Sequence, residues 1–252
     1  MDKVLQSIYP SMTAAADFLS NTNRLVQAIE LWKECLTFLN NKHLEKENDL
    51  ARKLSMMLYH RLCLGYAAIY NLSPAIEYGK KLLVLLRKCK RKKKESDTAG
   101  MLAILYYQKG EYKEAQQYLQ KALTMNTKIG DKDGQASCYI NLGNVFHSVG
   151  EYAKAEEYHK KALPITTEID DKHRQASCYM SLGNVSCSVG EYGKAKEYLQ
   201  KALTIKTEIA DKHGQASCYI NLGNVFHSVG EYAKAEESVS YTHLTLPTKR
   251  IV

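Results

Sequence analysis

The sequence repeats itself with a period of 40 residues, and this repetition constrains the fold more than any single residue does. The 27 residues from Asp131 to Glu157 recur from Asp211 to Glu237 with a single change, Asp133 to His213. A looser copy begins between them, at Asp171. A fixed period between about 20 and 50 residues is typical of arrays whose units bury their apolar faces against their neighbours. We therefore expect one continuous array.

Within one unit the apolar residues follow the spacing of two helices. In the unit that starts at Asp131, Tyr139, Leu142 and Phe146 line one face of a helix. Gly150 then interrupts the pattern, and a second apolar stripe follows, made by Tyr152, Ala155, Tyr158, Ala162 and Leu163. Each unit is therefore predicted to be a pair of antiparallel helices joined by a short turn, and the fold class to be all-α.

The spacing of the unit's aromatic and small residues is also a family signature. Tyr139, Leu142, Gly143, Phe146, Ala155 and Ala162 match the pattern aromatic-x2-Leu-Gly-x2-aromatic followed by two alanines, which resembles the tetratricopeptide repeat. The 40-residue unit is similar to those of the Pins/LGN adaptors and the kinesin light chains. The resemblance implies helix-turn-helix repeats stacked into a right-handed solenoid, and we expect the extra length of the unit in a longer second helix that ends at Asp131, Asp171 or Asp211.

The regularity of the repeat divides the chain into three predicted parts. Residues 1–94 hold degenerate units, residues 95–237 hold the regular array, and residues 238–252 break the pattern in the middle of a helix. We expect five full units and a truncated sixth. The last part resembles translated adapter sequence, so we expect a non-native tail at the end of a fragment and leave it out of functional reasoning.

A short cationic run accounts for most of the net charge of +8. Seven lysines and arginines lie between Arg87 and Lys94, and the rest of the chain is close to neutral. A surface that binds nucleic acid in general is therefore not expected. We interpret the run as the solvated, cation-rich end of a helix, and the alternative is a nuclear localisation or nucleic-acid patch.

The cysteines and the hydropathy pattern indicate the compartment. Three of the seven cysteines recur at the repeat period and none forms a CxxC pair, which favours reduced, buried residues. No membrane span or signal peptide is indicated. We expect a cytoplasmic protein, with a nuclear location as the alternative that Arg87 to Lys94 would direct.

We find no pattern that points to catalysis. Phosphate loops, dinucleotide fingerprints and nucleophile elbows are missing from the sequence, so we expect no enzyme activity, no cofactor and no small-molecule substrate. His147, Cys187 and His227 occupy one repeat position. Equivalent atoms of stacked helix pairs lie on the order of 10 Å apart, too far for shared metal ligation, so no metal site is predicted.

Polar residues recur on the side of the first helices that should line a concave groove. An asparagine carries both a donor and an acceptor, so a ladder of amides can hold the backbone of an extended peptide. In the resembled families, asparagines at the positions of Asn141 and Asn221 hold partner peptides, and Ser181 breaks the series. The predicted peptide-binding residues are Asn141, Asn144, His147, Asn184, Asn221, Asn224 and His227.

These residues predict an adaptor that binds a protein or peptide partner. The lysines and arginine of the carboxylate clamp found in cochaperone repeats are replaced here by Ile140, Ser177 and Ser181, which argues against that role. The alternative is that the repeats form the sensor arm of a larger signalling protein or enzyme whose catalytic or nucleotide-binding domain lies outside this sequence.

Overall fold

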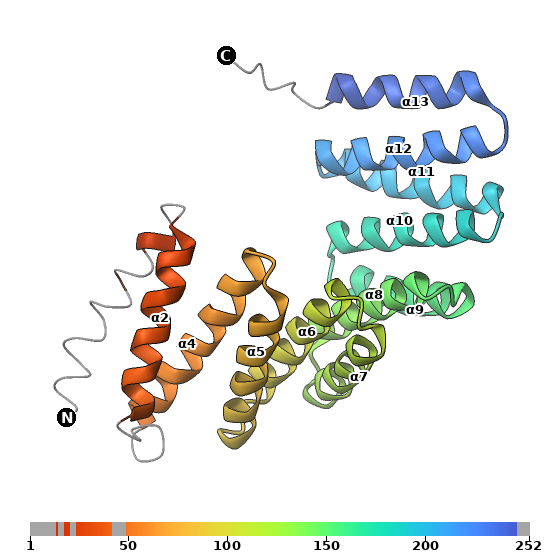
Figure 1. Cartoon of the computed structure of the whole chain (residues 1–252). Coiled ribbons are helices and arrows are strands. Elements are labelled where there is room, and N and C mark those ends of the chain that lie inside the picture. Colours follow the sequence, from red (N-terminus) through yellow and green to blue (C-terminus); the bar gives the residue numbers. More distant parts are fainter. Residues whose placement is uncertain (1–13, 15–17, 21–23, 42–48, 246–252) are drawn as a thin grey trace. The chain divides into compact units, whose positions relative to one another are not determined.

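The computed structural model describes residue 14 and residues 18–20, 24–41 and 49–245 (Figure 1). All regular elements among these residues are α-helices, which confirms the predicted fold class. The chain divides into two compact units, Met1–Met125 and Asn126–Val252. No helix of the described residues has the length and apolar character that crossing a bilayer requires.

The first unit contains α2 (Leu25–Asn41), α4 (Asp49–Ala68), α5 (Leu72–Lys88), α6 (Lys92–Gln108) and most of α7 (Tyr112–Ile129). Helix α4 packs on both α2 and α5, and α5 packs on α6. The apolar residues of α2 from Ala28 to Leu36 are buried together with Leu58 and Leu62. Residues 1–13, 15–17, 21–23 and 42–48, which belong to the part predicted to hold degenerate units, lie outside the described residues.

The second unit consists of the end of α7 and three helix pairs. These are α8 (Lys132–Ser148) with α9 (Tyr152–Glu168), α10 (Lys172–Ser188) with α11 (Tyr192–Glu208), and α12 (Lys212–Ser228) with α13 (Tyr232–Thr245). Each pair packs internally and on the next pair, and the first helices of neighbouring pairs also touch (Figure 1). The predicted helix-turn-helix repeat is thereby confirmed, while the right-handed path of the array stays a prediction.

Close approach within a pair depends on small residues. Ala155, Ala162 and Ala195 are fully buried. A Cβ on Gly183 would lie 2.7 Å from Cγ of Leu199, so any larger residue there would push the two helices apart. The conserved spacing of small residues within the repeat therefore sets the packing distance within a helix pair.

The extra length of the unit does not lie in the second helix alone. Helices α8 to α12 each span 17 residues, and Asp131, Asp171 and Asp211 do not end the second helices. Each of these aspartates is instead the N-cap of the next first helix, where its carboxylate accepts a hydrogen bond from the backbone N–H three residues later. The prediction was wrong because an aspartate after a helical pattern was assigned to the helix behind it.

The cationic run is likewise not the end of one helix. Helix α5 ends at Lys88, the turn contains Lys90 and Arg91, and Lys92 begins α6. Half of the run therefore lies at a helix N-terminus, where the macrodipole disfavours cations. The buried carboxylate of Glu95 offsets part of this charge, since it lies 3.1 Å from Nε of Arg87 and 3.7 Å from Nζ of Lys92.

One further expectation needs correction. Helix α13, expected to break off after Glu237, continues to Thr245. Among the described helices, α5 and α9 contain a proline. Pro74 lies in the first turn of α5, which tolerates a proline because its N–H needs no helical partner. Pro164 lies inside α9, which continues to Glu168.

Candidate functional site

The candidate site is the polar side of the first helices in the second unit. Leu142, Gly143 and Phe146 of α8 are buried, and this orientation leaves Asn141, Asn144 and His147 along the flank of the buried stripe. The same register holds in α10 and α12, and α10 touches both α8 and α12. The predicted residues therefore lie on one set of adjacent helices within a single compact unit.

Exposure differs along this face. Asn141, Asn144, His147 and Asn221 are half-buried, whereas Asn184, Asn224 and His227 are exposed. Among the described residues, the five asparagine side chains form no hydrogen bond with the protein, although the backbone carbonyls of Asn184 and Asn224 accept bonds from Ser188 and Ser228. The side-chain amides thus keep their donors and acceptors for a ligand.

One contact joins two repeats across the face. Nε2 of His147 on α8 lies 3.1 Å from Oγ of Ser188 on α10, and Ser188 Oγ also lies 3.0 Å from the carbonyl oxygen of Asn184, to which it donates. His147 can therefore donate to Ser188 when Nε2 carries the proton. The ring of His147 packs near Tyr152, with centroids 5.5 Å apart, and His227 repeats this contact with Tyr232 at 5.4 Å. These contacts orient the two imidazoles.

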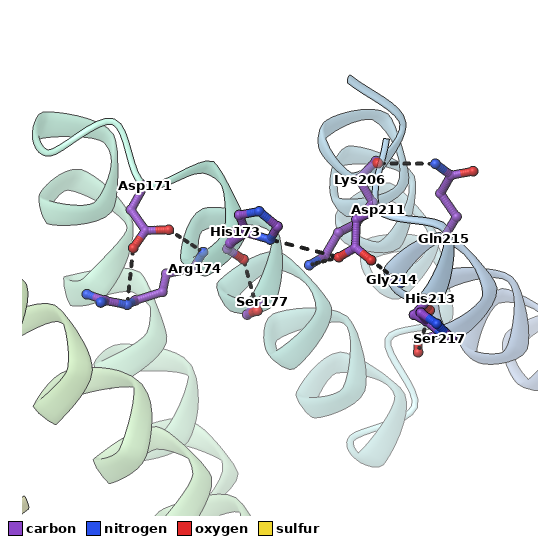
Figure 2. A network of polar contacts seen from close by, with 10 residues as sticks. All are labelled: Asp171, His173, Arg174, Ser177, Lys206, Asp211, His213, Gly214, Gln215 and Ser217. Carbon is purple, nitrogen blue, oxygen red and sulfur yellow. Dashed lines mark hydrogen bonds and ion pairs between the residues drawn. The ribbon is translucent and has the colours of Figure 1, made fainter. Parts of the chain in front are cut away.

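A second polar network fixes the starts of the first helices (Figure 2). Asp171 caps α10 and also pairs with Nε of Arg174 at 3.1 Å. The guanidinium of Arg174 reaches the preceding repeat, where Nη2 lies 2.7 Å from Oδ1 of Asp133. Asp133, the single position that differs between the near-identical copies, thus accepts from Arg174 of the middle copy. Neighbouring first helices are tied together at their N-termini.

The next junction uses a buried lysine instead (Figure 2). Nζ of Lys206, a residue only 7% exposed, lies 2.8 Å from Oδ2 of Asp211. That hydrogen bond, with the one from the Gly214 backbone, holds the pKa of Asp211 below its ordinary value. Gln215 donates to the carbonyl oxygen of Lys206 at 3.2 Å. The lysine stem fills the junction while its charge is neutralised.

The junction residues and the buried His159 were not predicted from the sequence. Lys206 occurs where the other units have Asn126 and Thr166, and His159 where they have Leu119 and Leu199. A comparison of the copies position by position would have singled them out. No three histidine, cysteine, aspartate or glutamate side chains of the described part gather as a metal site would require.

Comparison with known protein families identifies the repeat. A model of the tetratricopeptide repeat matches residues 94–168 and 174–239, more than half of the chain. The chain belongs to the tetratricopeptide repeat family. Domains of this family generally bind proteins or peptides. No curated protein matches the sequence.

Several solved structures share the tetratricopeptide fold. Nearly identical repeats from a Podosopora anserina protein assigned as a kinesin light chain are 17% identical, with a TM-score of 0.67 over 82% of this chain and 98% of that one. A Rap protein in complex with the Competence and Sporulation Factor is 17% identical, with a TM-score of 0.66 over 94% of this chain and 75% of that one.

A signalling ATPase gives the third comparison. The STAND protein PH0952 from Pyrococcus horikoshii, which has a tetratricopeptide repeat sensor, is 21% identical with a TM-score of 0.76. The match covers 92% of this chain but 35% of that protein. At these identities the likeness establishes the fold, and the resemblance to kinesin light chain arrays is confirmed at that level.

Proposed function

We propose that this tetratricopeptide array is a non-catalytic adaptor that holds an extended segment of a partner protein on the polar face of α8, α10 and α12. The observation that carries the proposal is a set of five asparagine amides on adjacent helices of one unit, none of which bonds to another described residue. The general protein-binding character of the family supports it, as does the Rap protein that was solved with the Competence and Sporulation Factor.

The chemistry of the face suits a peptide backbone more than particular side chains. Each asparagine offers an N–H donor and a C=O acceptor, which match the alternating groups of an extended chain. Because Ser181 interrupts the series, α10 contributes a single amide, Asn184, between the two amides of α8 and the two of α12. His147 and His227, oriented by Tyr152 and Tyr232, can add a donor or an acceptor near the end of each helix.

The test is the double change Asn141→Ala and Asn221→Ala. Unbiased peptide display on the wild-type chain should select binders, and the double change should weaken them by about tenfold in calorimetric titration, because each lost hydrogen bond costs about 0.5–1.5 kcal/mol. Helicity should not change. Gln200→Ala, on the exposed surface of α11, serves as the matched control. If the selected peptides bind the wild type and the double variant with equal affinity, the amide ladder is removed from the proposal.

A second candidate is the sensor arm of a larger signalling protein or enzyme. It is favoured by the STAND protein, in which repeats that this chain matches over 92% of its length form only part of a longer protein. Sequencing of the full-length transcript separates the two functions. A nucleotide-binding or protease-like domain after the array would favour the sensor arm, and its absence from the complete transcript would favour the adaptor.

The proposal places the adaptor in the cytoplasm, with a nuclear alternative directed by Arg87 to Lys94. A reporter fused to residues Leu82 to Ser96 tests the alternative. Nuclear accumulation of the fusion would support it, and a reporter that stays in the cytosol and binds no RNA would leave the cytoplasmic assignment.

A further inference from the structure

A cavity in the first unit differs in chemistry from the amide face. It has a volume of about 640 Å³ and lies among α4, α5 and α6. Its lining combines an apolar floor with three cations and a single carboxylate, Asp97. The floor is formed by Met56, Met57, Leu82 and Leu86, and the cations are Lys53, Arg91 and Lys94.

The charges around this cavity are only partly neutralised by the protein. Lys53 pairs with Asp49 at 2.7 Å, and Asp97 pairs with Lys93 at 3.3 Å. Within the described part of the chain, Arg91 and Lys94 form no ion pair, and both are exposed. The side of the cavity formed by the start of α6 therefore presents net positive charge to a ligand.

These cations occupy positions where they oppose helix stability. In α8, α10 and α12 the N-cap is an aspartate whose carboxylate accepts a backbone hydrogen bond. In α6 the N-cap is Arg91, which makes no such bond, and Lys92 to Lys94 fill the first turn. Both features cost stability at a helix N-terminus. Departures from a local rule of this kind are expected at functional sites.

An apolar track continues from the cavity along the same faces. On α4, Leu64 follows His60 by one turn and is 47% exposed. On α6, Ile104 follows Asp97 by two turns and is 45% exposed, and Tyr107 is 36% exposed. The cavity and this track together form a surface that is apolar along the helices and cationic at one end.

We propose that this surface binds an acidic amphipathic segment of a partner protein. An apolar side chain of the segment enters the methionine floor, and carboxylates beside it pair with Arg91 and Lys94. The volume lies within the range of about 300–1,000 Å³ typical of ligand pockets, and methionines adapt to side chains of different shape. The apolar floor does not suit a phosphate backbone, so charge and hydropathy together select an acidic peptide over nucleic acid.

The experiment uses the full chain and a fluorescein-labelled synthetic helical peptide with leucines and phenylalanines on one face and glutamates beside them. Fluorescence anisotropy should show saturable binding of this peptide. Two matched peptides, one with lysine in place of glutamate and one with serine in place of the apolar residues, should bind at least about tenfold more weakly. Equal binding of the three peptides would overturn the proposal.

Two variants assign the binding to this cavity. Arg91→Asp restores the N-cap used by the other first helices, so it should weaken the acidic peptide about tenfold while the thermal midpoint stays the same or rises. Met57→Asp should also weaken binding, because it places a negative charge in the apolar floor, where it would repel the carboxylates of the peptide. Lys113→Asp, an equal charge change in the first turn of α7 outside the cavity, should change the affinity less than about twofold.

Other occupants give different results. Sodium laurate that displaces the acidic peptide with higher affinity would indicate a small amphiphilic anion, and a labelled single-stranded RNA that binds more tightly would indicate nucleic acid. Either result would overturn the proposal. None of these measurements involves Asn141 or Asn221, so failure here is distinct from failure of the amide ladder.

Discussion

Replacement of His159 by leucine should stabilise the array. His159 of α9 is 1% exposed and packs against Gly143, where an added Cβ would lie 2.5 Å from the imidazole Cε1. Both ring nitrogens are buried, and neither has a hydrogen-bond partner in the part of the chain that the structure describes. The equivalent residue in α11, Leu199, packs against Gly183 in the same way and is fully buried. Leucine therefore fits the site that histidine occupies.

The size of the effect follows from the unpaired nitrogens. A buried polar group without a partner costs about 1–3 kcal/mol, so His159→Leu should raise the free energy of unfolding by about 2 kcal/mol at pH 7.5. Burial, with a smaller repulsion from His147, lowers the pKa of His159 from 6.5 to about 4. The unfolded chain therefore binds a proton at a higher pH than the folded chain does.

This difference in pKa makes the stability depend on pH in a known direction. The stability that neutral His159 retains above pH 6.5 is lost as the pH falls toward about 4. At pH 5.0 the loss amounts to about 2 kcal/mol for a group with these two pKa values. Because leucine does not titrate, the advantage of His159→Leu over the wild type should roughly double between pH 7.5 and pH 5.0.

Urea unfolding at the two pH values, followed by circular dichroism, measures the effect. The difference between wild type and variant isolates His159, because all other titrating groups are shared. The reciprocal change Leu199→His should lower the stability and introduce the same pH dependence. A His159→Leu variant that is no more stable than the wild type, or whose advantage is the same at both pH values, would refute the reasoning and show that the ring nitrogens have partners.

Two other predictions concern the packing and the caps. Gly143→Ala should lower the free energy of unfolding by about 2 kcal/mol, since the new Cβ would overlap with His159, whereas Gly193→Ala, with open space around it in α11, should raise it by about 0.5–1 kcal/mol in chemical denaturation. Asp211→Ala should lower the free energy of unfolding by at least about 2 kcal/mol, because it removes an N-cap and leaves the buried Lys206 ammonium unpaired. Asp131→Ala removes an N-cap that lies beside Asn126 instead of a lysine, so it should lower the free energy of unfolding by about 1 kcal/mol. Equal losses for the two aspartates in thermal unfolding would show that Lys206 finds another partner.

The helix pairs could be predicted from the sequence because the repeat states the same pattern several times. The equivalent residues Leu142, Leu182 and Leu222 are all buried. An apolar spacing that recurs in three copies is not a chance feature of one of them. The helix boundaries were harder to predict. An aspartate between two helical patterns fits either the end of one helix or the cap of the next, and only the hydrogen bond to the amide of Gly134 decides between them.

The two proposed surfaces differ in how far the sequence predicts them. The asparagine ladder followed from its period, whereas the cavity of the first unit combines residues from three helices that share no sequence pattern. Arg91 and Lys94 were interpreted as part of a solvated helix end. The comparison with Asp131 and Gly134, 40 positions later, would have shown that both had replaced cap residues.

The junctions of the second unit show how near-identical copies are kept distinct. Lys206 can be buried because the facing residue is Gly214, where a Cβ would lie 2.5 Å from the lysine Cδ. Asn126 likewise faces Gly134. In the middle copy, Arg174 of α10 occupies the position of Gly134 and Gly214. The equivalent of Asn126 and Lys206 on the preceding helix α9 is the short Thr166, whose hydroxyl donates to the carbonyl oxygen of Leu163. The longer side chains of Asn126 and Lys206 thus occur with glycine, and the shorter Thr166 occurs with arginine. If α11 took the place of α9 against α10, Lys206 would replace Thr166 and lie against Arg174, combining overlap with repulsion between two cations. These paired differences therefore disfavour assembly in the wrong register.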